Sequence, residues 1–103
     1  MNYTEHYRGI KIDVQAPHVE VDEAVQVELR SCIDKLVRFT HDINEVNLYI
    51  NIEGNGGAAI SKLGMRVAIP GPDIYADEDG DNWIGMLKSV TDKNIRQLQK
   101  VKK

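Results

Sequence analysis

The sequence predicts a single α+β domain in which two helices pack on one face of a four-stranded mixed sheet. Three observations lead to this fold class. The chain has 103 residues, a length typical of one domain. Four segments alternate apolar and other residues with the period of two that half-buried strands have. Two longer segments repeat apolar residues every three or four positions, as amphipathic helices do. We therefore expect residues 1–103 to form one domain with the order β-α-β-β-β-α.

The first predicted strand covers residues 10–14, where two isoleucines and a valine share one side of the strand. Pro17 ends this strand, and Asp22 is a suitable N-cap for the helix that follows. We expect that helix to run from about residue 22 to residue 41. Its apolar face contains Val25, Leu29, Cys32, Ile33, Leu36 and Phe39.

The middle of the chain predicts a hairpin followed by one more strand. Residues 46–52 and 62–69 both alternate, and the glycine-rich stretch 53–57 between them suits a turn. A Pro-Gly-Pro turn at residues 70–72 precedes a short strand at residues 74–76. The first two strands are joined by a helix, so they should pair in parallel with a right-handed crossover. The later strands should form an antiparallel meander.

The last predicted element is a helix that ends near residue 101 and is capped by Asp79 or Asp81. Placed on a helical wheel, its apolar residues share one face, which we expect to enter the core. That face contains Trp83, Leu87, Val90, Leu98 and Val101, with Met86, Ile84 and Ile95 on its flanks.

The charge of the chain is divided unevenly. The formal net charge is −3, but residues 82–103 carry six basic residues and one acid (+5), and residues 1–81 carry seven basic and fifteen acidic residues (−8). A basic segment on an acidic body suggests a polyanionic partner. The alternative is a solvated helix end whose lysines suit the negative end of the helix dipole.

The arrangement of the basic residues favours the polyanion. Lys93, Arg96, Lys100 and Lys103 form one stripe on the last predicted helix, and no acid shares it. Lys62 and Arg66 lie beside Tyr49 and Asn51 on the polar side of the predicted sheet. That side is either a second RNA-binding surface or simply the solvated side of the sheet.

The first predicted helix also contains arginines, and their role is open. Asp34 lies four residues from both Arg30 and Arg38, so either arginine is a candidate for an ion pair within the helix or for binding an anion.

Several classes of protein are excluded. No apolar run approaches the roughly 18–20 residues of a membrane span, and the N-terminus does not resemble a secretory signal. With Cys32 as its single cysteine the chain forms no internal disulfide, which suits a cytoplasmic location. The three histidines have no metal-ligand spacing. In the acidic run 77–81 the glycine and the twelfth residue do not match a calcium loop. We expect a binding module without a metal or cofactor, and not an enzyme.

The order of elements and several short segments resemble one protein family, the bacterial ribosome hibernation-promoting factors and ribosome-associated inhibitors. The resemblance rests on the strand at residues 10–14, Val-Glu-Val-Asp-Glu-Ala-Val at 19–25, Ile-Asn-Glu-Val at 43–46 and Asp-Ile-Tyr-Ala at 73–76. The basic segment at residues 92–100 resembles the family's typical D-K-x-x-R-Q-L-x-K run.

The resemblance implies a fold similar to that of double-stranded-RNA-binding domains. It also implies a cytoplasmic, non-enzymatic protein that binds ribosomal RNA of the small ribosomal subunit, in the messenger and transfer-RNA channel. Such a protein would promote ribosome hibernation under stress or in stationary phase, and the short form would be a monomer in solution.

The residues carried over as RNA contacts are Lys93, Arg96 and Lys100, with Lys88 and Lys103 as extensions; the sheet adds Arg66 as a candidate. The alternative is a protein-interaction module of the same fold that does not bind ribosomes.

Overall fold

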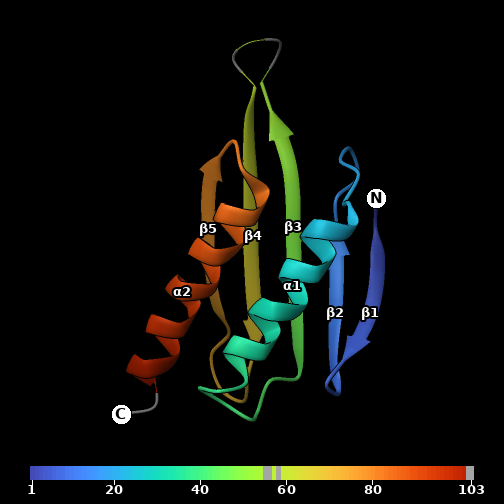
Figure 1. Ribbon diagram of the computed structural model, residues 1–103. Coiled ribbons are helices and arrows are strands. Elements are labelled where there is room, and N and C mark those ends of the chain that lie inside the picture. The colour runs from blue at the N-terminus through green and yellow to red at the C-terminus, as the bar shows by residue number, and fades with distance from the viewer. Residues whose placement is uncertain (55–56, 58, 102–103) are drawn as a thin grey trace.

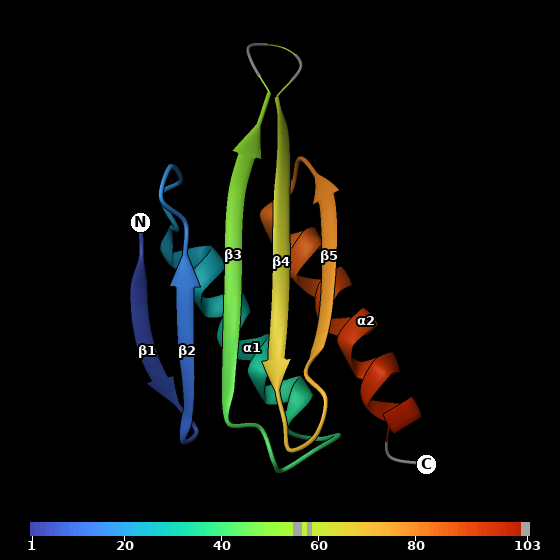
Figure 2. The same ribbon diagram turned by 180° about the vertical axis from the view of Figure 1, so that it is seen from behind.

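The computed structural model describes residues 1–54, 57 and 59–101 as a five-stranded sheet with two helices on one face (Figures 1 and 2). The elements in chain order are β1 (Tyr3–Tyr7), β2 (Ile10–Gln15), α1 (Glu23–Leu36), β3 (Glu45–Glu53), β4 (Ile60–Ala68), β5 (Ile74–Gly80) and α2 (Trp83–Val101). The strands lie in the sheet in their sequence order, from β1 at one edge to β5 at the other.

The predicted topology is confirmed. Strands β2 and β3 pair in parallel with α1 as the crossover between them, and β3, β4 and β5 form the antiparallel meander. Figure 1 shows α1 and α2 side by side on the same face of the sheet, and in Figure 2 the opposite face is open. The core lies between these layers, because the strands turn one apolar side towards the helices. Its largest fully buried side chains include Ile12, Leu48, Met65, Leu87 and Leu98.

The number of strands differs from the prediction, because residues 3–7, for which no strand was predicted, form β1. This strand pairs with β2 in an antiparallel hairpin, with Tyr3 opposite Val14 and Tyr7 opposite Ile10. Arg8 and Gly9 connect the strands, and both have positive φ angles, 54° and 75°, as the two-residue turns of hairpins require.

Polar contacts attach β1 to α1, and this explains why the strand has no apolar alternation in the sequence. Arg30 of α1 donates to both carboxylate oxygens of Glu5, at 2.7 and 2.8 Å. The Tyr7 hydroxyl donates to Asp34 at 2.9 Å. Glu5 therefore occupies an inward-facing position of β1 that is usually apolar. Without an apolar residue there, the sequence pattern does not predict a strand.

We expect the Glu5–Arg30 pair to make stability depend on pH. Arg30 holds the pKa of the Glu5 carboxyl below its usual value of 4.5, so the pair stabilises the fold above that pH. This contribution is lost as the pH falls through the lowered pKa of the folded state. Glu5→Gln should therefore be less stable than the wild type at pH 7, and the difference in unfolding free energy should shrink towards pH 3. Urea unfolding at both pH values checks this. Glu20→Gln, at an exposed position, is the control; a constant difference for Glu5→Gln would contradict the expectation.

Helix α1 begins where predicted and ends earlier. The Asp22 side chain accepts a hydrogen bond from the Val25 backbone amide at 2.9 Å, which confirms the N-cap. The helix stops at Leu36 and not near residue 41, and the chain leaves it through a turn. Phe39 is partly buried against the core from that turn.

The start and the inner face of α2 also differ from the prediction. Asn82 caps the helix by accepting from the Gly85 amide at 3.1 Å, because β5 continues through Gly80 and includes Asp79. Val101, expected in the core, is 46% exposed. Thr91 and Asn94 are buried instead, with their side chains donating to the backbone carbonyls of Leu87 (2.8 Å) and Met65 (3.1 Å).

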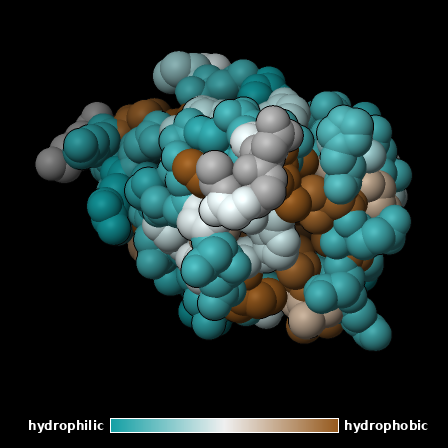
Figure 3. All heavy atoms as spheres, turned by 90° about the horizontal axis from the view of Figure 1, so that it is seen from above, coloured by the Kyte–Doolittle hydropathy of each residue, from teal (hydrophilic) through white to brown (hydrophobic). Residues whose placement is uncertain are grey.

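The β3–β4 hairpin extends beyond the helix layer, and apolar side chains are exposed there. Ile52 has the same orientation as the buried Ile50, yet it is 45% exposed. Figure 1 shows that the ends of β3 and β4 reach beyond both helices. Ile60, on the paired end of β4, is 48% exposed. The space-filling view of this end shows hydrophobic residues among hydrophilic ones around the hairpin (Figure 3). Strand alternation alone therefore overestimates the length of the core.

Gly64 of β4 allows an aromatic ring to lie across the open face of the sheet. A Cβ atom at this position would overlap the hydroxyl group of Tyr75 and lie 2.9 Å from its Cζ atom. The ring is at the surface and free to turn outwards. We expect Gly64→Ala to displace the Tyr75 ring while changing the free energy of unfolding by less than about 1 kcal/mol. Nuclear Overhauser contacts between the Tyr75 ring and residue 64 report the displacement; their persistence in the variant would contradict it.

Candidate nucleic-acid interface

Helix α2 presents its basic residues on the side that the core does not use. Its buried residues lie against the sheet and α1, and four cations and one acid lie along the remaining surface. These charged residues are Lys88, Lys93, Arg96, Lys100 and Asp92, with a net charge of 4 − 1 = +3. Because residues three and four apart share one side of a helix, Lys93, Arg96 and Lys100 of the predicted stripe lie together along the described part of α2.

Lys93 is held against the edge strand β5. Its ammonium group lies 3.1 Å from the Glu78 carboxylate and donates to the Asp77 backbone carbonyl at 2.9 Å. Gln97 donates to the Tyr75 carbonyl at 2.6 Å in the same way. These two side chains donate hydrogen bonds to the outward-facing carbonyls of β5 and so cover the edge of the sheet. Glu78 also neutralises part of the charge of Lys93.

Arg96 and Lys100 are the exposed members of the stripe. Together with Lys93 they line a shallow groove of about 330 Å³ between α2 and β5, which Tyr75 and Asp77 line from the strand. Within the described residues, neither Arg96 nor Lys100 forms an ion pair. Their charge is therefore available to an anion from outside the protein.

Lys88 lies away from the stripe, in a groove of about 330 Å³ between the two helices. Lys35, in the last turn of α1, and Arg38, in the turn that follows the helix, line the same groove. Lys35 pairs with Asp92 of α2 at 2.6 Å, and neither Lys88 nor Arg38 has an ion pair in the described part of the chain. Sequence reasoning did not find Lys35, because its position beside α2 depends on how the helices pack.

The two arginines whose role was open differ. Arg30 pairs with Glu5 of β1 and not with Asp34. Asp34 instead accepts from Tyr7 and from Arg8, the latter at 2.5 Å, and these contacts hold the pKa of its carboxyl below the usual value. Arg38 forms no ion pair within the described part of the chain, and it lies with Lys88 in the groove between the helices.

Arg66 lies on the opposite, open face of the sheet. Asp73 accepts two hydrogen bonds from its guanidinium group, at 2.6 and 2.9 Å, and Asn47 accepts a third. Lys62 on the same strand lies 3.4 Å from the Asp79 carboxylate. The structure therefore does not bring Arg66 together with the cations of α2. Lys103 lies outside the described residues.

Two further titratable groups, Glu78 and Cys32, have shifted pKa values. The pKa of the Glu78 carboxyl is held below its usual value, mainly by the hydrogen bond from the Ser89 hydroxyl and secondly by Lys93. Burial raises the pKa of the Cys32 thiol to about 11, so it is protonated at neutral pH and unsuited to nucleophilic attack. Residues 1–54, 57 and 59–101 include no cluster of histidine, cysteine and acidic side chains suited to a metal ion.

Neither of the two helices, over their described lengths, is long and apolar enough to cross a membrane.

Comparisons with known proteins agree with this geometry. A family model described as "Sigma 54 modulation protein / S30EA ribosomal protein" matches residues 12–103. A ribosomal subunit interface protein from Coxiella burnetii has a similar structure, with a TM-score of 0.76 and 18% sequence identity over 88% of this chain and 96% of that one. The N-terminal domain of Protein Y from Thermus thermophilus is also similar, with a TM-score of 0.65 and 13% identity over 94% of this chain and 99% of that one. At these identities the structural matches establish the fold.

Proposed function

Because this chain belongs to the sigma 54 modulation protein / S30EA ribosomal protein family, whose members are non-enzymatic ribosome-binding proteins, we propose that it binds the small ribosomal subunit through the basic surface of its helices. Its site is the messenger and transfer-RNA channel, where it excludes both ligands and promotes ribosome hibernation under stress or in stationary phase. It acts in the cytoplasm as a monomer.

The observation that carries this proposal is the group of unpaired cations on the helix layer. Arg96, Lys100, Lys88 and Arg38 are exposed, and no carboxylate among the described residues pairs with them. Cations of this kind neutralise RNA phosphates and position a protein without reading a base sequence. A folded ribosomal RNA suits such a surface, because it is recognised mainly by its shape and its phosphates.

Within this proposed interface, Arg96 and Lys100 are the principal contacts and Lys88 extends the surface towards α1. Lys93 contributes less, because Glu78 competes for its charge. Lys103 lies outside the described residues, and its part in this interface rests on the sequence pattern alone. Arg66 faces away from this surface and is engaged by Asp73, so we assign it to the sheet and not to the interface.

The experiment that tests the proposal is co-sedimentation of the purified protein with small ribosomal subunits at about 50 mM and about 200 mM salt. Binding through phosphate contacts releases counterions, so it should be near stoichiometric at low salt and much weaker at high salt. The same assay with large subunits measures selectivity. Absence of binding at low salt would overturn the proposal.

We expect Glu78→Gln to strengthen ribosome binding modestly. The substitution removes the carboxylate that lies 3.1 Å from Lys93, so a further cation becomes available, and the gain should be about twofold to threefold at low salt. Glu20→Gln, an exposed acid outside both grooves of the helix layer and with no ion pair among the described residues, is the matched control for the change in net charge. Equal gains in both variants would show that only net charge matters.

The second candidate function is a protein-interaction module that uses the open face of the sheet. The observation that favours it is the acidic character of this face, where carboxylates engage Lys62 and Arg66. The two functions use opposite faces of one chain, so the co-sedimentation assay decides the first without deciding the second.

A further inference from the structure

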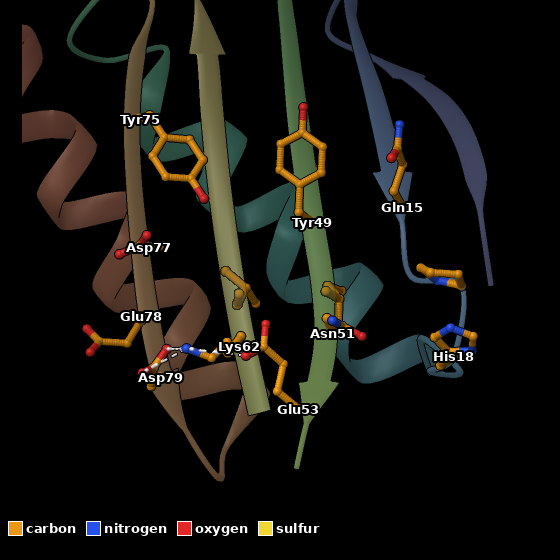
Figure 4. Close-up of a pocket in the computed structure, with 13 residues that line it drawn as sticks. Gln15, His18, Tyr49, Asn51, Glu53, Lys62, Tyr75, Asp77, Glu78 and Asp79 are labelled. Carbon is orange, nitrogen blue, oxygen red and sulfur yellow. Dashed lines mark hydrogen bonds and ion pairs between the residues drawn. The ribbon is translucent and has the colours of Figure 1, made fainter. Parts of the chain in front are cut away.

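The open face of the sheet has a hollow of about 430 Å³ between two exposed tyrosines. Tyr49 of β3 is 38% exposed and Tyr75 of β5 is 48% exposed. Figure 4 shows their rings on either side of β4. Gly64 of β4, opposite Tyr49 in the register, has no side chain, so the Tyr75 ring lies over the backbone between them. The result is an aromatic surface beside a depression that no segment of the described chain fills.

The charge of this hollow is negative. Three acids of the open face, Glu53, Asp77 and Asp79, surround it, and Glu78, which pairs with Lys93, also lines it. Lys62 is the one lysine among its lining residues, so their formal balance is 1 − 4 = −3. Lys62 lies 3.4 Å from Asp79 and 3.9 Å from Glu53.

Asp77 stands directly opposite Gly64 in the register, and its carboxylate forms no ion pair within the described residues. The negative charge of Asp77 also affects Tyr75. The pKa of the Tyr75 hydroxyl is raised mainly by burial and secondly by Asp77. A ligand that brings positive charge to this point therefore gains an unpaired carboxylate beside an aromatic ring.

We propose that this hollow binds an arginine-bearing segment of a partner protein. A guanidinium group stacks on a tyrosine ring and donates two parallel hydrogen bonds to a carboxylate, and the hollow offers both beside each other in Tyr75 and Asp77. A lysine ammonium matches the charge but not the planar surface. RNA does not match, because its phosphates would face the three carboxylates.

The hollow and the groove between α2 and β5, which Lys93, Arg96 and Lys100 line, share strand β5. Tyr75 and Asp77 line both, and Lys93 and Gln97 of α2 hold the backbone of the same two residues. A phosphate backbone on the α2 side and a basic protein segment on the sheet side would thus lie next to each other. This inference goes beyond ribosome binding and does not depend on it.

The test uses the purified full chain and a fluorescein-labelled peptide of alternating arginine and glycine. Fluorescence anisotropy at about 50 mM salt should show saturable binding, weaker for the lysine–glycine peptide and absent for the glutamate–glycine peptide. In ¹⁵N-correlated spectra the arginine peptide should shift the amides of Gly64, Asp77 and their neighbours, and leave those of Arg96 and Lys100 unchanged.

Substitutions locate the site. Asp77→Asn should weaken binding of the arginine peptide about tenfold, and Tyr75→Leu about threefold. Asp81→Asn removes the same charge outside the hollow and should change the dissociation constant less than about twofold. All three positions are exposed, so the variants should fold. If one variant fails to fold, the peptide-induced shifts in the wild-type spectra still locate the site.

Three results would overturn the proposal. The first is equal weakening by Asp77→Asn and Asp81→Asn, which would indicate attraction by net charge alone. The second is a peptide-induced shift confined to other surfaces. The third is occupation of the hollow by a different partner, seen as shifts of the same amides with an RNA oligonucleotide or on self-association of the free protein.

Discussion

Replacing Arg96 and Lys100 together by glutamate is expected to weaken binding of the small ribosomal subunit by about 100-fold at about 100 mM salt. Both side chains are exposed and form no ion pair with another described residue, so each is available to neutralise a phosphate, and the reversed charges would repel the RNA. The dependence of binding on salt should also become less steep, because two fewer counterions are released. Filter binding or co-sedimentation over a series of salt concentrations measures both effects.

A matched control separates the site from the net charge. Lys11→Glu with Lys62→Glu changes the charge by the same amount on the open face of the sheet, where both lysines already lie near carboxylates. This control should weaken binding less than about tenfold. Equal losses in the two double variants would contradict the assignment of the interface to α2. Surface substitutions of this kind usually change stability by less than about 0.5 kcal/mol, so unfolding curves confirm that the variants are intact.

The order of the elements could be predicted because local patterns determine it. The alternation at residues 10–14 and 46–52 and the helical repeat along α1 are properties of neighbouring residues, and the crossover rule then orients β2 and β3. Strand β1 could not be predicted in this way. Its inward-facing Glu5 is accommodated by Arg30, which lies 25 residues away in the sequence, and no local pattern reports such a contact.

The candidate site could be predicted in part for the same reason. The spacing of Lys93, Arg96 and Lys100 places them on one side of a helix whatever it packs against. Their partners depend on tertiary structure: Glu78 reaches Lys93 from β5, and Arg38 approaches Lys88 because the helices pack together. The sequence therefore predicts where the cations lie along α2, and the fold determines which of them remain unpaired.

Leu98→Ala is expected to lower the free energy of unfolding by about 2–5 kcal/mol. Leu98 is fully buried in the inner face of α2, and its truncation removes apolar contacts and leaves a cavity. For a chain of this size the loss corresponds to a fall in melting temperature of about 10–20 °C. Val101→Ala, one turn further along the helix, should change stability by less than about 0.5 kcal/mol, because Val101 is 46% exposed. Urea and thermal unfolding followed by circular dichroism compare the two variants.

The same pair of variants connects the core with the interface. The helical repeat alone assigns both residues to the inner face, so equal losses of stability would favour that assignment over the structure. Leu98 lies between Arg96 and Lys100 in the sequence and anchors the turn that presents them. Its truncation should therefore leave ribosome binding close to normal at about 10 °C, where the variant is folded, and reduce binding near 37 °C in proportion to the unfolded fraction. Loss of binding by the folded variant at low temperature would mean instead that Leu98 positions the cations within the native state.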